Sequence, residues 1–169
     1  MKANAWNVKI ILIGVAIIFA GSAAQSAQPV SDEDQIRAIE KAIATAENAD
    51  QLMKYYAPDV TLYDLIVPSE YHGWKNVYAN NVGQFKNIKN PRIAFQSLEA
   101  GVEGKLGYAY MTIHYESDSP IDGSHNVIVF RQTDILKKID GRWLVTFQHI
   151  SVPYDPKTKV AITEPAQNH

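Results

Sequence analysis

The stretch HNVIVFRQTDILKKIDGRWLVTFQHISVP (residues 125–153) predicts two β-strands joined by a tight turn. Strand-forming apolar residues recur on both sides of Asp140-Gly141, a pair that tolerates the positive backbone angles of a two-residue hairpin turn. Two similar runs come before it, RIAFQSLEAGVEG (92–104) and KLGYAYMTIHYES (105–117). Four successive strands separated by turn residues predict an antiparallel meander.

The chain before this meander predicts three helices and one short strand. Residues 31–50 have acids in the first turn and apolar residues at helical spacing, at Ile36, Ile39 and Ile43. A second helix is expected over QLMKYYA (51–57), capped by Asp50 and ended by Pro58, and a third over residues 74–87. The expected fold class is therefore α+β: a conical fold with N-terminal helices packed on a strongly curved, mainly antiparallel sheet that encloses a hollow.

The N-terminal segment has the pattern of a secretory signal peptide. Lys2 and Lys9 precede an apolar run over residues 10–20, and GSAAQSAQ (21–28) follows with small residues suited to cleavage near Ala24 or Ala27. The expected organisation is a signal peptide over residues 1–27, one domain over 28–158 and a tail over 159–169. We expect a periplasmic or secreted protein without membrane attachment after cleavage, with an uncleaved anchor as the alternative.

Composition excludes several classes of function. Removing Lys2 and Lys9 from the 16 basic side chains leaves 14 against 18 acidic ones, a net charge of −4 that disfavours nucleic acid as a partner. The chain has no cysteine, which excludes thiol catalysis and thiolate metal sites. The five histidines show no pair at ligand spacing, so no metal site is expected.

The strand pattern VTLYDLIVP (60–68) places a carboxylate on its apolar face. Val60, Leu62 and Asp64 share one side because successive side chains of a strand point to opposite faces. A carboxylate at the mouth of an apolar hollow is a general base for removing a proton beside a carbonyl group. The alternative is that Asp64 accepts hydrogen bonds from backbone amides of the following loop.

Other polar side chains join this site only if their strand faces line the hollow. Arg131 and Thr133 share one face, and His149 shares another with its neighbours at alternate positions. On that assumption Arg131 binds an anion and His149 relays a proton, whereas the alternative is that they pair with cross-strand acids or face water. His114 lies in the hollow or on the outer wall, since alternation alone does not choose.

The chain resembles the SnoaL-like and ketosteroid-isomerase-like proteins of the nuclear transport factor two fold. The resemblance rests on YYAPDVTLYD (55–64), Gly73, VYANN (77–81) and above all GRWLVTFQHISVPYDP (141–156). It implies that Asp64 is the general base and that Tyr56 and Tyr78 are pocket aromatics. The oxyanion tyrosine of the isomerases falls on Ala42, and their protonated aspartic acid falls near Thr133 or Asp134, so steroid isomerisation is not expected.

These observations predict a small-molecule-binding protein, in one reading an enzyme that performs cofactor-free acid/base chemistry on an apolar carbonyl compound. The expected catalytic residues are Asp64, His149 and Arg131. The expected ligand-binding residues are Tyr56, Trp74, Tyr78, His114 and Thr133, although aromatic clusters are also plain core. The alternative function is a non-catalytic module that binds a small hydrophobic ligand or dimerises through its outer sheet face, and a homodimer is expected.

Overall fold

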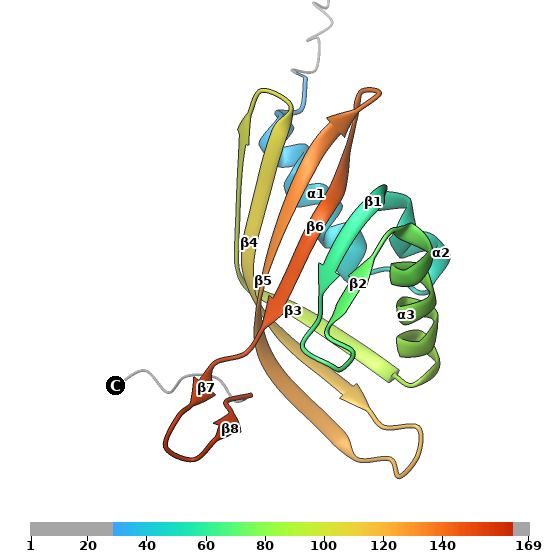
Figure 1. The fold of residues 1–169 in the computed structure, drawn as a ribbon, viewed down its shortest axis with the longest axis vertical. Helices are drawn as coiled ribbons and strands as arrows, with labels where there is room; N and C mark the ends of the chain where they lie inside the picture. Colours follow the sequence, from blue (N-terminus) through green and yellow to red (C-terminus); the bar gives the residue numbers. More distant parts are fainter. Residues whose placement is uncertain (1–28, 164–169) are drawn as a thin grey trace, which may run out of the picture.

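The computed structural model describes residues 29–163, so the predicted signal peptide over 1–27 and the end of the predicted tail lie outside the described residues. Figure 1 shows the arrangement of the elements. The helices are α1 (Asp32–Ala44), α2 (Ala49–Leu52), the 3-10 turn η1 (Met53–Tyr55) and α3 (Trp74–Lys86). The strands are β1 (Tyr56–Tyr63), β2 (Glu70–His72), β3 (Lys89–Glu103), β4 (Leu106–Asp118), β5 (His125–Ile139), β6 (Arg142–Ser151), β7 (Tyr154–Asp155) and β8 (Val160–Ala161).

The main sheet has six strands in the order β2-β1-β6-β5-β4-β3. Strands β3 to β6 form the predicted antiparallel meander, and β1 adds a parallel pairing with β6. Asp140 and Gly141 both have positive φ, at 49° and 79°, as the predicted hairpin turn requires. The long strands bend around α1, which lies along their inner face (Figure 1), and the α+β fold class is confirmed.

Helix α1 closes the inner face of the sheet. Ser31 caps the helix by accepting a hydrogen bond from the Asp34 backbone amide at 3.1 Å, and Ile36 is fully buried against the sheet. Gly107 on β4 lies directly under Ile36, and a side chain at this position would collide with that residue. The missing side chain therefore lets α1 approach the sheet closely.

The second predicted helix is shorter than expected. Helix α2 is capped by the Asn48 side chain rather than by Asp50, and the chain is already extended at Tyr56. Pro58 disfavours helical geometry at the residue before it, so the helix cannot reach residue 57. Tyr56 is buried and pairs with Val145 of β6, which adds a tertiary preference for strand geometry.

Strand β6 contains an irregularity that reverses the direction of its side chains. Leu136 pairs with Val145, but the preceding Ile135 pairs with Phe147, so Thr146 is an extra residue in β6. Trp143 and Val145 point inward before this bulge, and Gln148 points inward after it. Simple alternation would instead have put His149 on the inner face with Trp143 and Val145.

The end of the described chain forms a small separate hairpin. Strands β7 and β8 pair with each other and stand away from the main sheet in Figure 1. The backbone amide of Val129 donates to the carbonyl oxygen of Thr163 at 2.8 Å, which returns the chain to β5. The predicted change from domain to tail at residue 158 falls inside this hairpin. No helix within residues 29–163 is long and apolar enough to cross a membrane.

Candidate functional site

A cavity of about 410 Å³ lies between helices α1 and α3 and the inner face of the sheet. Most of its lining is apolar and comes from every layer of the fold, with Ile43 on α1, Phe85 on α3 and Ile113, Phe130 and Ile150 on the central strands. A few polar side chains interrupt this lining. A large apolar cavity with a small number of convergent polar groups is the usual form of a small-molecule site. The predicted hollow is present.

Asp64 lies on the cavity wall, directly after β1. Its Oδ2 atom accepts hydrogen bonds from the side-chain amides of Asn80 at 3.1 Å and Gln84 at 2.9 Å, both on α3. Its Oδ1 atom lies 3.4 Å from the backbone nitrogen of Ile66 in the following loop. Helix α3 therefore fixes the carboxylate against the cavity, and the loop amide makes a weaker contact.

A second acidic group lies at the interface of α1 and β5. Glu40 is 1 % exposed and Asp134 is fully buried, and Glu40 also lines the cavity. Burial, reinforced by the neighbouring Asp134 charge, raises the pKa of Glu40 well above its ordinary value. Burial likewise raises the pKa of Asp134 to about 6, against hydrogen bonds that lower it. Near neutral pH the pair therefore holds one proton between its two carboxyl groups.

Three further side chains organise this acid pair. Gln132 and Gln148 each donate a side-chain N–H to Asp134 Oδ2, at 2.9 and 3.1 Å. The Tyr56 hydroxyl donates to Gln148 Oε1 at 3.1 Å, and burial raises the pKa of Tyr56 so that it stays protonated. Gln132, Gln148 and Tyr56 also line the cavity. The polar end of the cavity is therefore a connected network of residues from α1, β1, β5 and β6.

The charged side chains that line the cavity are all acidic. They are Glu40, Glu47 and Asp64, and no lysine, arginine or histidine of the described chain lines it. Glu47 is exposed, whereas Glu40 lies in the dry interior. The described residues contain no cluster of three or more acids or histidines able to hold a metal ion.

Three of the predicted site residues lie on the other side of the sheet. Arg131, Thr133 and His149 are exposed on the outer face, although the predicted strands do bring Thr133 and His149 together as a cross-strand pair. The prediction that Arg131, Thr133 and His149 lie opposite Asp64 is therefore wrong. The bulge at Thr146 turns His149 outward, and on β5 the alternate set that includes Asp134 faces inward.

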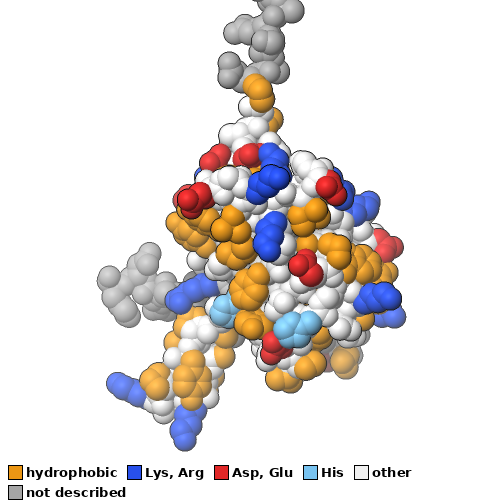
Figure 2. All heavy atoms as spheres, turned by 45° about the horizontal axis from the view of Figure 1, so that its top comes forward, with side chains coloured by type: hydrophobic (Ala, Val, Ile, Leu, Met, Phe, Trp, Pro, Cys, Tyr) orange, Lys and Arg blue, Asp and Glu red, His pale blue; other side chains and the backbone are white. Residues whose placement is uncertain are grey.

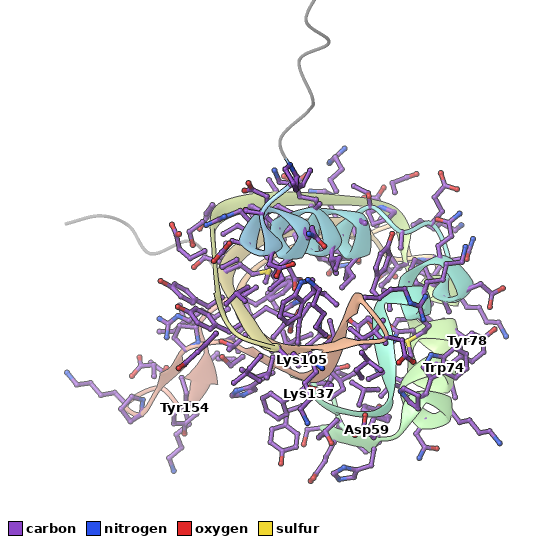
Figure 3. The ribbon with its side chains drawn as sticks, turned by 90° about the horizontal axis from the view of Figure 1, so that it is seen from above. Asp59, Trp74, Tyr78, Lys105, Lys137 and Tyr154 are labelled. Atoms are coloured by element: carbon purple, nitrogen blue, oxygen red, sulfur yellow. The ribbon has the colours of Figure 1, made fainter. Side chains whose placement is uncertain are left out.

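Three other predicted ligand contacts also lie outside the cavity. Trp74 and Tyr78, both on α3, stack on each other with ring centroids 4.9 Å apart, and Figure 3 shows them at the edge of the molecule. The Tyr78 hydroxyl donates to Asp50 Oδ1 at 2.9 Å, so these rings fasten α2 to α3. The Nε2 atom of His114 lies 3.1 Å from Glu116 Oε1 on the outer face of the sheet. Of the expected ligand residues, Tyr56 is the one that lines the cavity.

Sequence reasoning overlooked Glu40, Gln132 and Gln148. Glu40 has a recognisable signal, because it follows the buried Ile36 by four residues and therefore lies on the apolar face of its helix. Gln132 alternates with Asp134 and Leu136, a pattern that marks the inner face once Leu136 is taken as core. Gln148 has no such signal, since the bulge at Thr146 hides its direction.

Comparison with known proteins agrees with this architecture. A family model described as a SnoaL-like domain matches residues 36–155. A nuclear transport factor two-like protein of unknown function from Pseudomonas putida is similar in structure, with a TM-score of 0.71 and 20% identity over 80% of this chain and 96% of that chain. A ketosteroid isomerase-like protein from Erwinia carotovora has a TM-score of 0.63 and 13% identity over 71% of this chain and 95% of that one.

A nuclear transport factor two-like superfamily protein from Salmonella enterica is also similar, with a TM-score of 0.64 and 17% identity over 73% of this chain and 92% of that chain. A comparison with curated protein sequences found no match. At these identities the structural neighbours establish the fold and carry no activity across to this chain. The family match, the helices on a curved sheet and the enclosed cavity together show that the chain belongs to the SnoaL-like family of the nuclear transport factor two fold.

Proposed function

We propose that this chain is an exported small-molecule-binding protein that takes an apolar carbonyl compound into its cavity. The observation that carries the proposal is the apolar cavity of about 410 Å³, a volume suited to a small organic molecule. Asp64 supplies a fixed carboxylate on its wall. Export rests on the N-terminal sequence pattern, and N-terminal sequencing of the mature protein would show cleavage near residue 24 or 27 if it is right.

The acid/base part of the proposal assigns one step to Asp64. A ligand carbonyl group beside this carboxylate has acidic protons on the neighbouring carbon, and Asp64 removes one of them to give an enolate. The amides of Asn80 and Gln84 hold the carboxylate in one orientation during this transfer. Arg131 and His149 take no part, because they lie on the outer face of the sheet.

Ligand binding is tested by a thermal-shift screen of hydrophobic ketones and aldehydes. A compound that binds only the folded protein, at a hundredfold excess over its dissociation constant, stabilises it by about 2.7 kcal/mol and raises Tm by about 5–10 °C. An Ala46→Trp variant, which places an indole ring on the cavity wall, loses this shift. The control variant Ala161→Trp, at an exposed position on β8 outside the cavity lining, keeps the shift. The proposal fails if no hydrophobic compound shifts the wild-type Tm.

The outer face of the sheet supports a second proposal, that the protein is a homodimer whose cavity only binds its ligand. Tyr108 and Tyr110 are about half exposed and stack there with centroids 6.3 Å apart, and Tyr63 lies against Phe147 on the same face. Over the face drawn in Figure 2, hydrophobic side chains lie among charged ones of both signs. A second copy suits such a face, because a two-fold axis places the same surface of both chains in contact and so buries these exposed aromatic side chains.

Light scattering on the purified protein tests the dimer. We expect twice the chain mass at micromolar concentration, and the monomer mass for Tyr110→Glu, which places a charge in the contact. Tyr154→Glu is the matched control, since this exposed tyrosine lies on β7 away from the sheet face (Figure 3). A wild-type protein with the mass of one chain contradicts the dimer.

A further inference from the structure

The acid pair of Glu40 and Asp134 lies apart from the step assigned to Asp64. The two Glu40 carboxyl oxygens and Asp134 Oδ1 are buried, and no N–H or hydroxyl group within the described residues donates to them. The network of Gln132, Gln148 and Tyr56 satisfies only the other Asp134 oxygen. One proton shared between the two acids cannot satisfy all of these carboxyl oxygens, and their burial limits the access of water that could replace the missing donors.

Glu40 connects the acid pair to the cavity wall, although its two carboxyl oxygens are themselves buried in that wall. Glu40 is among the cavity-lining residues, whereas Asp134 lies behind it on β5 and has no exposed surface. A buried acceptor without a donor destabilises the folded protein, so a ligand that brings an N–H group to this position recovers the lost hydrogen bond. The inner end of the cavity therefore selects for a hydrogen-bond donor.

The charge of the acid pair further restricts the kind of ligand group that can donate this hydrogen bond. The pair carries one negative charge near neutral pH, and its neighbours Gln132, Gln148 and Tyr56 are neutral. The other charged residues of the cavity wall, Glu47 and Asp64, are also acids. A cation is the complementary ligand group, because a charge-assisted hydrogen bond is about twice as strong as a neutral one. An anionic ligand would meet like charges.

We propose that the cavity binds an apolar molecule carrying a protonated amine, which donates a hydrogen bond to Glu40 and neutralises the Glu40–Asp134 pair. This inference rests on the proposed function only in requiring that the cavity accept an apolar ligand. It adds a basic nitrogen to that ligand, at a different part of the cavity wall from the carbonyl group beside Asp64. Both groups on one molecule make the substrate class an apolar amino ketone or amino aldehyde.

Three probes of equal length test the amine: phenylbutylamine, phenylbutanol and phenylbutanoate. By calorimetry at about pH 7.5 we expect the amine to bind about tenfold more tightly than the alcohol, the ratio given by about 1.4 kcal/mol from a charge-assisted hydrogen bond. The carboxylate should bind more weakly than the alcohol. Equal affinities for the amine and the alcohol, or preferred binding of the carboxylate, overturn the inference while leaving an apolar-ligand site in place.

Two further measurements locate the preference at the acid pair. The double variant Glu40→Gln/Asp134→Asn keeps the shape and removes both ionisable groups, so the amine and the alcohol should bind it equally. Glu47→Gln, which removes an exposed acid from the same cavity, should change the amine affinity less because water screens that charge. An amine preference that survives in the double variant contradicts the assignment to the pair.

A pH series on the wild-type protein keeps the test decisive if the double variant does not fold. The titratable groups around the site are Glu40 from α1, Asp134 from β5 and Tyr56 from β1, with Asp64 and Glu47 elsewhere on the cavity wall. Protonation of Asp134 below about pH 6 makes the pair neutral. Amine affinity should fall about tenfold by about pH 5, and alcohol affinity should not. If none of the three probes binds at any pH, this inference fails, and the thermal-shift screen of ketones and aldehydes decides the proposed function separately.

Discussion

Replacing Glu40 with glutamine is expected to raise the free energy of unfolding at about pH 8 by about 1–3 kcal/mol, the usual cost of leaving a buried polar group such as Asp134 Oδ1 without a donor. The wild-type folded protein must keep Glu40 protonated at a pH where the unfolded chain would release that proton, and this lowers its stability. Glutamine has nearly the same shape and carries an N–H donor toward Asp134 at every pH.

The sign of this effect sets the pH range of the measurement. Both acids of the pair have a higher pKa in the folded protein than in the unfolded chain. Their stabilising contribution is complete below about pH 4 and is lost as the pH rises through about 6 and beyond. Asp122, with a pKa lowered to about 2, works in the opposite direction, but its stabilising contribution is already complete above about pH 4. Urea unfolding between about pH 5 and pH 8 therefore covers the range in which the pair loses its stabilising contribution.

The readout is the difference between the stability curves of two proteins. Wild type should lose stability from about pH 5 to pH 8, and Glu40→Gln should lose much less over the same range. Glu47→Gln serves as the matched control, because it removes an exposed acid close to the same cavity and should follow the wild-type slope. Parallel curves for wild type and Glu40→Gln would show that Glu40 is ionised in the folded protein, contrary to the pKa direction.

The fold followed from the sequence wherever local signals and tertiary packing agree. Alternation in the last four strands and the Asp140-Gly141 turn led to the observed meander, and Ser31 marked the start of α1. The second helix was overestimated at Tyr56, whose helical spacing competes with burial in a strand. Propensity is a weak prior, and tertiary pairing overrides it at such boundaries.

The candidate site was predicted correctly only at β1, where the alternation of inward and outward side chains is not interrupted. Val60 and Leu62 are core residues, and Asp64 follows them to the cavity as expected. On β6 the extra residue Thr146 reverses the inner and outer faces, and no feature of the sequence marks a bulge there. The prediction therefore moved His149 inward and missed Gln148. A single inserted residue on one strand accounts for both errors.

The acid pair was missed because the predicted partners of Asp64 were basic residues on the strands of the sheet. Asp134 was expected only as an alternative ion-pair partner of Arg131, and as one position for the protonated acid of the isomerases. Among residues 29–163 it has no basic partner, and its neighbour is the acid Glu40 from the opposite layer. The pairing of two acids from α1 and β5 depends on how the helix sits on the sheet. Strand alternation alone does not contain that information.

Asp64→Asn is expected to reduce proton exchange on a bound carbonyl compound by at least about a hundredfold, the usual contribution of a general base. The ligand would be the strongest binder from the thermal-shift screen. Its protons beside the carbonyl group exchange with deuterium in heavy water only if the protein removes them, and this exchange is followed by NMR. The substitution takes away the basic carboxylate and leaves a side chain of the same shape.

The hydrogen bonds around Asp64 allow a loss of proton exchange to be distinguished from structural damage to the site. Asn80 and Gln84 both donate to Asp64 Oδ2, and the carbonyl oxygen of asparagine can occupy that position and accept both hydrogen bonds. Ligand affinity and Tm should therefore stay close to wild type while exchange falls. Asp59→Asn, which changes an exposed acid on β1 (Figure 3), should exchange at the wild-type rate. Exchange at the wild-type rate in Asp64→Asn would show that Asp64 is not the base. Exchange no faster than in buffer with the wild-type protein would show that the protein only binds the ligand, because the cavity is an active site only if its carboxylate takes the proton.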